Sequence, residues 1–151
     1  MVRILIVTQG RLADELLLAA QRIAGRTEHV SALSLDWNDD VETSRERVSE
    51  TVEQLDAEEG LLILTDVFGG TPYNLATNHF LPGRVEILAG VNLPIVVRLA
   101  CLDNARRPVT ELAEWIEAKG RSSICLGGLP EKSKESCRPT TAVAGSGDGH
   151  G

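Results

Sequence analysis

The sequence predicts a doubly wound α/β domain: one mainly parallel sheet with helices on both faces. Short apolar runs rich in Ile, Leu and Val alternate with longer segments whose apolar residues recur at helical spacing. Strands that alternate with helices favour parallel pairing through right-handed crossovers. A chain of 151 residues with 42% hydrophobic and 25% charged residues is typical of one globular domain with a full core.

The first half of the chain predicts two strand and helix units. The strands are expected at residues 2–8 and 30–35, where β-branched and other apolar residues dominate. The helices are expected at residues 11–24, ended by Gly25, and at residues 41–56. Asp39 with Glu42 three residues later forms a capping-box pattern, which we prefer to a metal site because a hard cation needs more oxygen ligands.

The second half predicts strands at residues 61–65 and 84–88, each followed by a helix. The helix after residue 92 has Asn92 as its expected N-cap, and a further helix after Pro108 is expected to end before Gly120. Residues 122–126 are expected to form a short last strand, for which an antiparallel arrangement is one alternative. The domain therefore covers residues 1–126, and residues 127–151 are expected to be a flexible tail rich in Gly, Pro, Ser, Thr and Lys.

Asp66 follows the buried strand at residues 61–65, so its carboxylate is expected at a strand tip. Gly69 and Gly70 allow close backbone approach, and Thr71 and Pro72 are expected as the N-cap and first residue of a helix. The amides at a helix N-terminus, with their partial positive charge, favour an anion such as phosphate. A plain strand-to-helix turn explains this stretch equally well by itself.

Gln9 and Gly10 end the first strand in the same way and supply the second element, with Gly10 expected to bind the anion together with Gly69 and Gly70. Ligands of parallel sheets bind beyond the carboxyl ends of the strands, where the strand order reverses. If the order begins 2-1-3-4, the reversal lies between strands one and three. Gln9 and Asp66 then face one another across a shared polar pocket.

Composition excludes several partner classes. A net charge of −7, no Lys/Arg-rich run and 3% aromatic residues argue against nucleic acid. No segment has the length of a signal peptide core or a membrane span, so we expect no direct membrane insertion. Cys101, Cys125 and Cys137 are odd in number and form no C-x-x-C, which indicates neither a disulfide framework nor a zinc site and fits a reducing cytoplasm. No cofactor and no metal are expected.

Three segments together resemble the enzyme IIA component of the mannose/fructose family of the bacterial phosphoenolpyruvate-dependent sugar phosphotransferase system. They are ILIVTQGRLADELL, LLILTDVFGGTPYNLA and VEILAGVNLPIVV, in the order and spacing of that family. The resemblance spans residues 1–126. It implies a homodimer that takes a phosphoryl group from the histidine phosphocarrier protein and passes it to a IIB component. In some members a strand near the C-terminus is exchanged between subunits, for which residues 122–126 are the candidate.

The resemblance also assigns roles to residues. The phosphoryl acceptor of the family is a histidine in a V-T-H-G setting, and Gln9 stands at that position. Asp66 matches the carboxylate that orients the histidine, and Thr71 matches a hydroxyl that donates to phosphoryl oxygens beside the Gly69 and Gly70 amides. An amide nitrogen lacks the free lone pair of imidazole, so we expect this chain not to accept phosphate.

The remaining histidines, His29, His79 and His150, are expected to be exposed and distant from Asp66. Gln9 is then either an engineered replacement or a natural change that ends phosphotransfer. The alternatives to a IIA component are a non-catalytic regulatory module that keeps the fold and pocket, and the related phosphotransferase subunit of dihydroxyacetone kinase. A hydrolase with Asp66 as general base is the third reading, although no nucleophile accompanies it.

Overall fold

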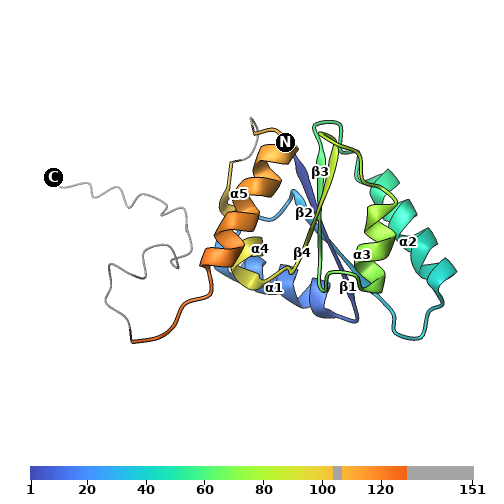
Figure 1. Cartoon of the computed structure of the whole chain (residues 1–151), viewed down its shortest axis with the longest axis horizontal. Coiled ribbons are helices and arrows are strands. Elements are labelled where there is room, and N and C mark those ends of the chain that lie inside the picture. The colour runs from blue at the N-terminus through green and yellow to red at the C-terminus, as the bar shows by residue number, and fades with distance from the viewer. Residues whose placement is uncertain (104–106, 129–151) are drawn as a thin grey trace.

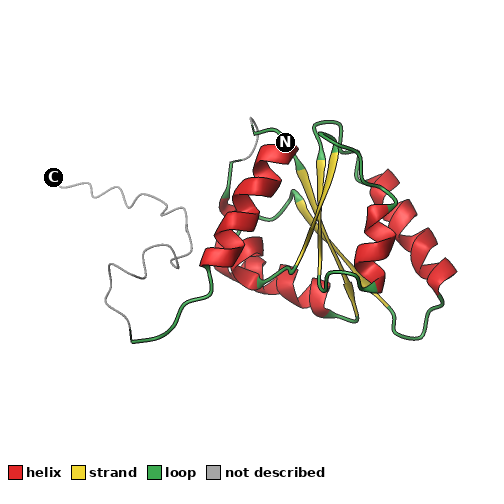
Figure 2. Cartoon of the chain, viewed as in Figure 1, coloured by secondary structure: helices red, strands yellow, loops and turns green. Residues whose placement is uncertain are grey.

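The computed structural model describes residues 1–103 and 107–128 and contains one parallel sheet between two layers of helices (Figures 1 and 2). The four strands lie in the order β2-β1-β3-β4, and every neighbouring pair is parallel. Their bounds are β1 Arg3–Gln9, β2 Val30–Leu35, β3 Leu61–Thr65 and β4 Val85–Ala89. The predicted α/β fold class is confirmed, and the strands have the order 2-1-3-4 on which the shared pocket of Gln9 and Asp66 depended.

The helices divide between the two faces of the sheet (Figure 1). On one face lie α1 (Leu12–Ala24), α4 (Leu93–Cys101) and α5 (Val109–Ser122), and on the other α2 (Val41–Gln54) and α3 (Thr71–Thr77). Asn92 caps α4 as expected, since its Oδ1 accepts from Ile95 N at 3.0 Å. None of these helices is both long enough and apolar enough to cross a membrane.

Two hydrophobic cores explain why the strands are apolar without alternation. Ile4 and Ile6 of β1 pack in the core that α1, α4 and α5 complete, whereas Leu5 and Val7 pack in the core under α2 and α3. Successive side chains of a strand point to opposite faces, so covering both faces buries residues 4–8 of β1. β3 is buried throughout for the same reason.

The register places the tips of the central strands side by side. Gln9 pairs with Leu35 of β2, and Val7 pairs with Thr65 of β3. Because β1 and β3 run in the same direction, the residues that follow them emerge at one edge of the sheet. The connections leave β1 toward β2 and β3 toward β4, so the order reverses between β1 and β3.

The C-terminal end of the domain differs from the prediction. Ser122 is the last residue of α5, and residues 124–126 form no strand in the described chain, with Ile124 and Leu126 84% and 76% exposed. Gly120 lies inside α5 and does not end it. A Cβ on Gly120 would lie 2.6 Å from Ile95 Cδ1, so the glycine is needed for close packing of α5 on α4.

Two predicted caps are also wrong. Gly70 is the N-cap of α3, and Thr71 is its first helical residue. The N-cap of α2 is Asp40, one residue after the predicted Asp39, and its Oδ1 accepts from Thr43 N at 2.7 Å. These hydrogen bonds to Thr43 hold the pKa of Asp40 below its usual value. In both cases neighbouring residues have cap-forming chemistry, and the path of the loop selects one of them.

Two other expectations concern the chain beyond the core. Cys101 is a free thiol, whereas Cys125 is disulfide-bonded, which the prediction of no disulfide framework did not anticipate. Cys137 and all but the first two residues of the expected tail 127–151 lie outside the described residues.

Candidate functional site

The side chain and backbone of Gln9 both form hydrogen bonds at the tip of β1. Its backbone N–H donates to Asp66 Oδ2 at 2.9 Å, and its side-chain Nε2 donates to the carbonyl oxygen of Leu35 at 3.2 Å. Residues 9 and 66 therefore converge, as the sequence predicts. The contact runs through the Gln9 backbone, while the amide side chain turns toward β2.

Asp66 joins the tips of two neighbouring strands. Its Oδ2 accepts from Gln9 N, and its Oδ1 accepts from Val67 N at 2.7 Å. A carboxylate offers about four acceptor positions, so two backbone bonds leave capacity for another donor. Asp66 is half-buried, and its carboxylate remains available at the carboxyl edge of the sheet.

Gly10 has a left-handed backbone with φ of 68° and lies directly under Trp37. A Cβ on Gly10 would lie 2.6 Å from Trp37 Nε1, so only glycine leaves room for the indole. The Gly10 N–H donates to Leu35 O at 2.7 Å. Sequence analysis gave Gly10 only an anion-binding role and missed Trp37, because their proximity depends on the path of the loop after β2.

Thr8 is a second residue that the sequence analysis missed. It is fully buried, and its Oγ1 accepts from Ala13 N at 2.8 Å and donates to Gly10 O at 3.3 Å. The helix α1 has no side-chain cap at its N-cap residue Arg11. Thr8 therefore satisfies an amide of the first turn from the preceding strand. A Thr two residues before a glycine turn was the available signal.

The loop between β3 and α3 contains the other predicted site residues. Gly69 has φ of 80°, which is strained for other residues, and Gly70 donates its N–H to Val67 O at 3.0 Å. Asn74 Nδ2 donates to Gly69 O at 3.2 Å and braces the turn. Thr71 is exposed in the first turn of α3, so its hydroxyl is accessible. The Gly70 amide is already engaged within the loop.

Thr65 is the polar residue that precedes Asp66. It is fully buried, and its Oγ1 has no hydrogen-bond partner within the described residues. Strand alternation places Thr65 on the same face as Leu61 and Ile63, which is the face covered by α2 and α3. A buried hydroxyl without a partner is unusual and costs free energy.

The histidines do not take part in this site. His29 is buried, contrary to the expectation of an exposed side chain, and its Nε2 lies 2.7 Å from Leu99 O. It precedes β2 and so lies at the opposite edge of the sheet from Gln9. His79 is half-buried with Nε2 3.4 Å from Ser49 Oγ, and His150 lies outside the described residues. Residues 1–103 and 107–128 contain no cluster of three metal-ligating His, Cys, Asp or Glu side chains.

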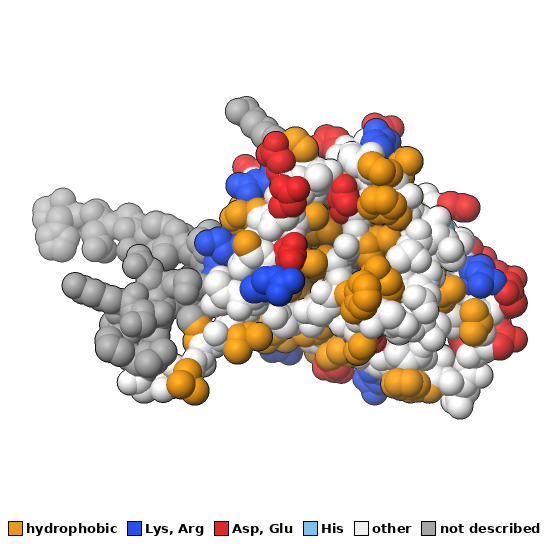
Figure 3. Space-filling model, in the orientation of Figure 1, with side chains coloured by type: hydrophobic (Ala, Val, Ile, Leu, Met, Phe, Trp, Pro, Cys, Tyr) orange, Lys and Arg blue, Asp and Glu red, His pale blue; other side chains and the backbone are white. Residues whose placement is uncertain are grey.

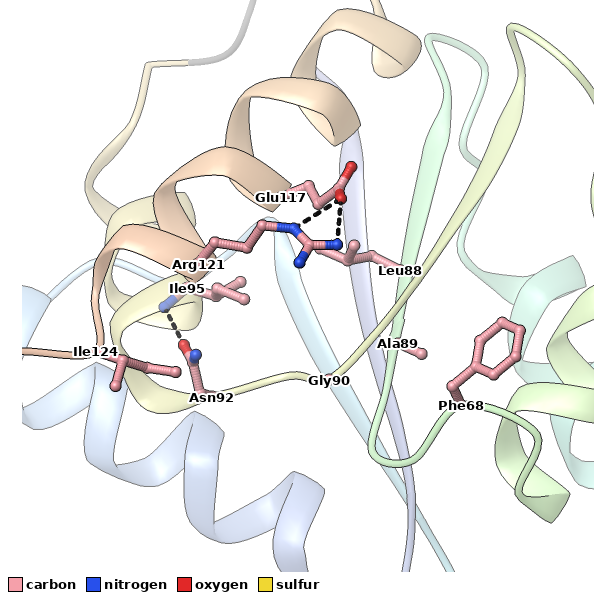
Figure 4. Close-up of a pocket in the computed structure, with 10 residues that line it drawn as sticks. Phe68, Leu88, Ala89, Gly90, Asn92, Ile95, Glu117, Arg121 and Ile124 are labelled. Atoms are coloured by element: carbon pink, nitrogen blue, oxygen red, sulfur yellow. Dashed lines mark hydrogen bonds and ion pairs between the residues drawn. The ribbon is translucent and has the colours of Figure 1, made fainter.

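A groove of about 470 Å³ lies at the carboxyl end of β4, between this strand and α5. Leu88, Ile95, Gly120 and Ile124 line it together with Arg121, whose guanidinium is paired with Glu117 at 3.0 Å (Figure 4). Figure 3 shows hydrophobic side chains exposed on this face between α5 and α3. Ala89 and Gly90 at the tip of β4 and Phe68 in the loop after Asp66 also line the groove. Because Gly90 N donates to Asp66 O at 2.9 Å, the groove borders the loop that follows β3.

Comparisons with known proteins agree with the geometry. Residues 3–117 match the model of the family EIIA-man, described as PTS system fructose IIA component. The mannose-specific EIIAB component of the PTS system of Escherichia coli (strain K12) is 29% identical over 144 residues, which are 95% of this chain and 44% of that protein. The chain thus spans less than half the length of that relative. The fructose-specific EIIA component of Bacillus subtilis (strain 168) is 29% identical over 103 residues, 68% of this chain and 70% of that protein.

Solved structures show the same fold. The mannose/sorbose specific IIA subunit from Enterococcus faecalis superposes with a TM-score of 0.73 at 26% identity, covering 85% of this chain and 96% of that one. The PTS IIA protein associated with the fucose utilization operon from Streptococcus pneumoniae also gives a TM-score of 0.73 at 26% identity, covering 83% and 92%.

Proposed function

Because this chain belongs to the family of PTS system fructose IIA components, we propose that it acts as the IIA component of a mannose-type sugar phosphotransferase system. The family role is to relay a phosphoryl group from the histidine phosphocarrier protein to a IIB component. We further propose that the protein works in the cytoplasm as a homodimer, without cofactor or metal. The sugar specificity of such a system belongs to its membrane components.

The observation that carries this proposal is the meeting of two strand tips. Gln9 and Asp66 lie 57 positions apart in sequence, and a 2.9 Å hydrogen bond joins them at the carboxyl edge of the sheet. Parallel sheets place ligand chemistry at such a reversal of strand order. An open, shallow position also suits a reaction whose substrate is a phosphorylated side chain of another protein.

The proposed roles follow from the chemistry of the residues. A histidine at position 9 attacks phosphorus with a ring nitrogen, while the bond from phosphorus to the donor histidine breaks. Asp66 stabilises the resulting positive charge on the ring. Thr71 donates its hydroxyl to the phosphoryl oxygens, beside the predicted anion-binding residues Gly10, Gly69 and Gly70. The Gly10 and Gly70 amides already donate to Leu35 O and Val67 O, so the Gly69 amide is the proposed backbone donor.

Gln9 removes the nucleophile from this arrangement. Its amide nitrogen is conjugated with the carbonyl, and it donates a hydrogen bond to Leu35 O. We therefore propose that this chain, as it stands, does not accept phosphate. The second candidate function, a non-catalytic regulatory module, is favoured by the same observation: the side chain at position 9 is held in an internal hydrogen bond.

The test is phosphorylation with labelled phosphoenolpyruvate, enzyme I and the histidine phosphocarrier. We expect no label on the wild-type chain and label on Gln9→His. Label on the wild-type chain would show that position 9 is not the acceptor. If Gln9→His folds but stays unlabelled while a competent IIA protein is labelled, the regulatory module is the better reading.

The control is the double variant Gln9→His with Asp66→Asn. The amide side chain at position 66 keeps one acceptor oxygen near the backbone N–H of residue 9. It lacks the negative charge that would stabilise a cationic ring at position 9. We expect label to appear more slowly than in Gln9→His. Sedimentation of the wild-type chain separately tests the proposed homodimer, and a monomer at micromolar concentration would refute it.

A further inference from the structure

Trp37 is an exposed aromatic residue beside the proposed site. Its side chain is 76% exposed, and its indole Nε1 lies over Gly10, next to Gln9. It follows Leu35, the last residue of β2 and the acceptor of the Gln9 side chain. The indole is therefore held at the rim of the carboxyl edge, where a protein approaching Gln9 would meet it.

Phe68 occupies the corresponding place on the other side. It is 75% exposed, follows Asp66 by two residues, and packs on Tyr73 with ring centroids 4.7 Å apart. Because β1 lies between β2 and β3, the loop with Trp37 and the loop with Phe68 flank Gln9. Figure 1 shows both loops along the lower edge of the view.

The stability of the fold does not explain why aromatic side chains are exposed at this edge of the sheet. The whole chain has two Trp, two Phe and one Tyr, and Trp37, Phe68 and Tyr73 all lie at this edge. Burying an aromatic ring is strongly stabilising, so a ring left three-quarters exposed contributes little to the core. Tyr and Trp are, in contrast, the residues that dominate the binding energy of protein interfaces.

The charge around Trp37 indicates the kind of partner. The segment 36–42 carries Asp36, Asp39, Asp40 and Glu42 and no basic residue, in a chain of net charge −7. Asp39 contacts Arg47 at 3.6 Å, and Glu42 contacts Arg45, so part of this charge is compensated from α2. Asp36 and Asp40 leave an acidic loop around the exposed indole, which complements a positively charged protein surface.

We propose that Trp37 is a specificity-determining contact for the phosphocarrier that docks over Gln9, with its indole packed against an arginine or lysine side chain of that protein. The inference rests on the proposed function, which supplies the partner. Trp is the best aromatic partner for a cation, and the interaction strengthens as the two groups lose water. The neighbouring carboxylates raise the local concentration of cationic groups.

The experiment measures binding of a purified histidine phosphocarrier protein that lacks tryptophan. In Trp115→Phe, Trp37 is the remaining tryptophan, and its emission reports directly on docking. We expect the emission to shift on titration. We expect Trp37→Ala to weaken binding by about tenfold or more, and Trp37→Phe to weaken it less.

Phe80→Ala is the matched control, because Phe80 is a 51% exposed aromatic that follows α3 at the other edge of the sheet. It should bind as the wild-type chain does. Equal binding by the wild-type chain and Trp37→Ala would overturn the role of Trp37 and leave the proposed function intact. Failure of the wild-type chain to bind any phosphocarrier would overturn both. If the affinity for the phosphocarrier is the same at low and at high salt, the proposed contact with an arginine or lysine side chain is wrong.

Discussion

The tips of β1 and β3 are built from the same residue types and closed in different ways. Each tip contains a fully buried threonine, Thr8 or Thr65, followed by a polar residue, and a glycine precedes the next helix. Thr8 forms hydrogen bonds to Ala13 N and Gly10 O. Thr65 Oγ1 has no hydrogen-bond partner in the described chain. The same local pattern therefore gives a satisfied tip in β1 and an unsatisfied hydroxyl in β3.

The difference shows that sequence order sets which polar groups reach the edge, while packing sets which of them are paired. At the β1 tip, the first turn of α1 lies close enough for a strand hydroxyl to accept from its amide. At the β3 tip, the longer loop through Val67 and Phe68 carries α3 onward, and its amides bond within the loop.

Asp66 connects the two tips, and its removal should have the largest effect. Asp66→Ala leaves the Gln9 and Val67 amides without their acceptor, and we expect the free energy of unfolding to fall by about 3 kcal/mol. Urea denaturation followed by circular dichroism measures this. Asp66→Asn should lose less, since one oxygen remains. A change below about 0.5 kcal/mol in Asp66→Ala would mean that the tips are held by the sheet alone.

The two threonines provide a matched pair. Thr8→Val removes the acceptor of a buried amide and should destabilise the fold by about 2 kcal/mol. Thr65→Val replaces a hydroxyl that has no partner by a methyl group of similar size, and should be neutral or stabilising by up to about 1 kcal/mol. Thermal unfolding of both variants decides the comparison. Equal losses in the two would show that Thr65 has a partner in solution.

Gly10 and Gly69, the glycines of the two tips, allow backbone strain to be measured separately from contact with Trp37. Gly10→Ala and Gly69→Ala both place a side chain in a left-handed backbone, and each should cost about 1–2 kcal/mol. A Cβ at Gly69 meets nothing within 4 Å, whereas at Gly10 it meets Trp37. Tryptophan emission should therefore change in Gly10→Ala and stay constant in Gly69→Ala. An unchanged emission in both would place the indole away from Gly10.

The smallest expected change in stability concerns α2, the helix that follows β2. Asp40 caps α2 through Thr43 N, and its pKa is lowered by these hydrogen bonds. A lowered pKa in the folded state stabilises the fold above the usual pKa of aspartate, and this stability is lost as the pH falls through the lower value. The wild-type chain should therefore exceed Asp40→Asn in stability at neutral pH by a small margin that disappears in acid. A margin that grows in acid would contradict the assigned cause.

The groove along β4 adds a second contrast with the strand tips. It has a volume of about 470 Å³ and is lined by apolar residues together with Asn92, Glu117 and Arg121, whereas Gln9 lies at an edge where its backbone and side chain are both hydrogen-bonded. β4 is the last strand of the sheet, and one side of its backbone has no neighbouring strand in the described chain. The groove is lined by neither Gln9 nor Asp66, so its volume does not mark the proposed site.

Much of this fold follows from local rules. The strands at residues 30–35 and 61–65 are confirmed residue for residue, because apolar runs bounded by polar residues leave little choice of register. Asn92 was correctly predicted to cap α4. Gly120 was misplaced, since a helical glycine and a terminal glycine look alike until Ile95 is known to pack against it.

The sequence by itself determined the order of elements along the chain and the parallel sheet, because hydrophobic periodicity and chain connectivity are local properties. It brought Gln9 and Asp66 to one cleft only on the condition that the strands lie in the order 2-1-3-4, which the tertiary structure shows. Only the tertiary structure decided that Asp66 binds backbone amides, that Gln9 donates to Leu35, and that Trp37 covers Gly10. These contacts join residues far apart in the chain, and their distances depend on how the packed loops settle against one another.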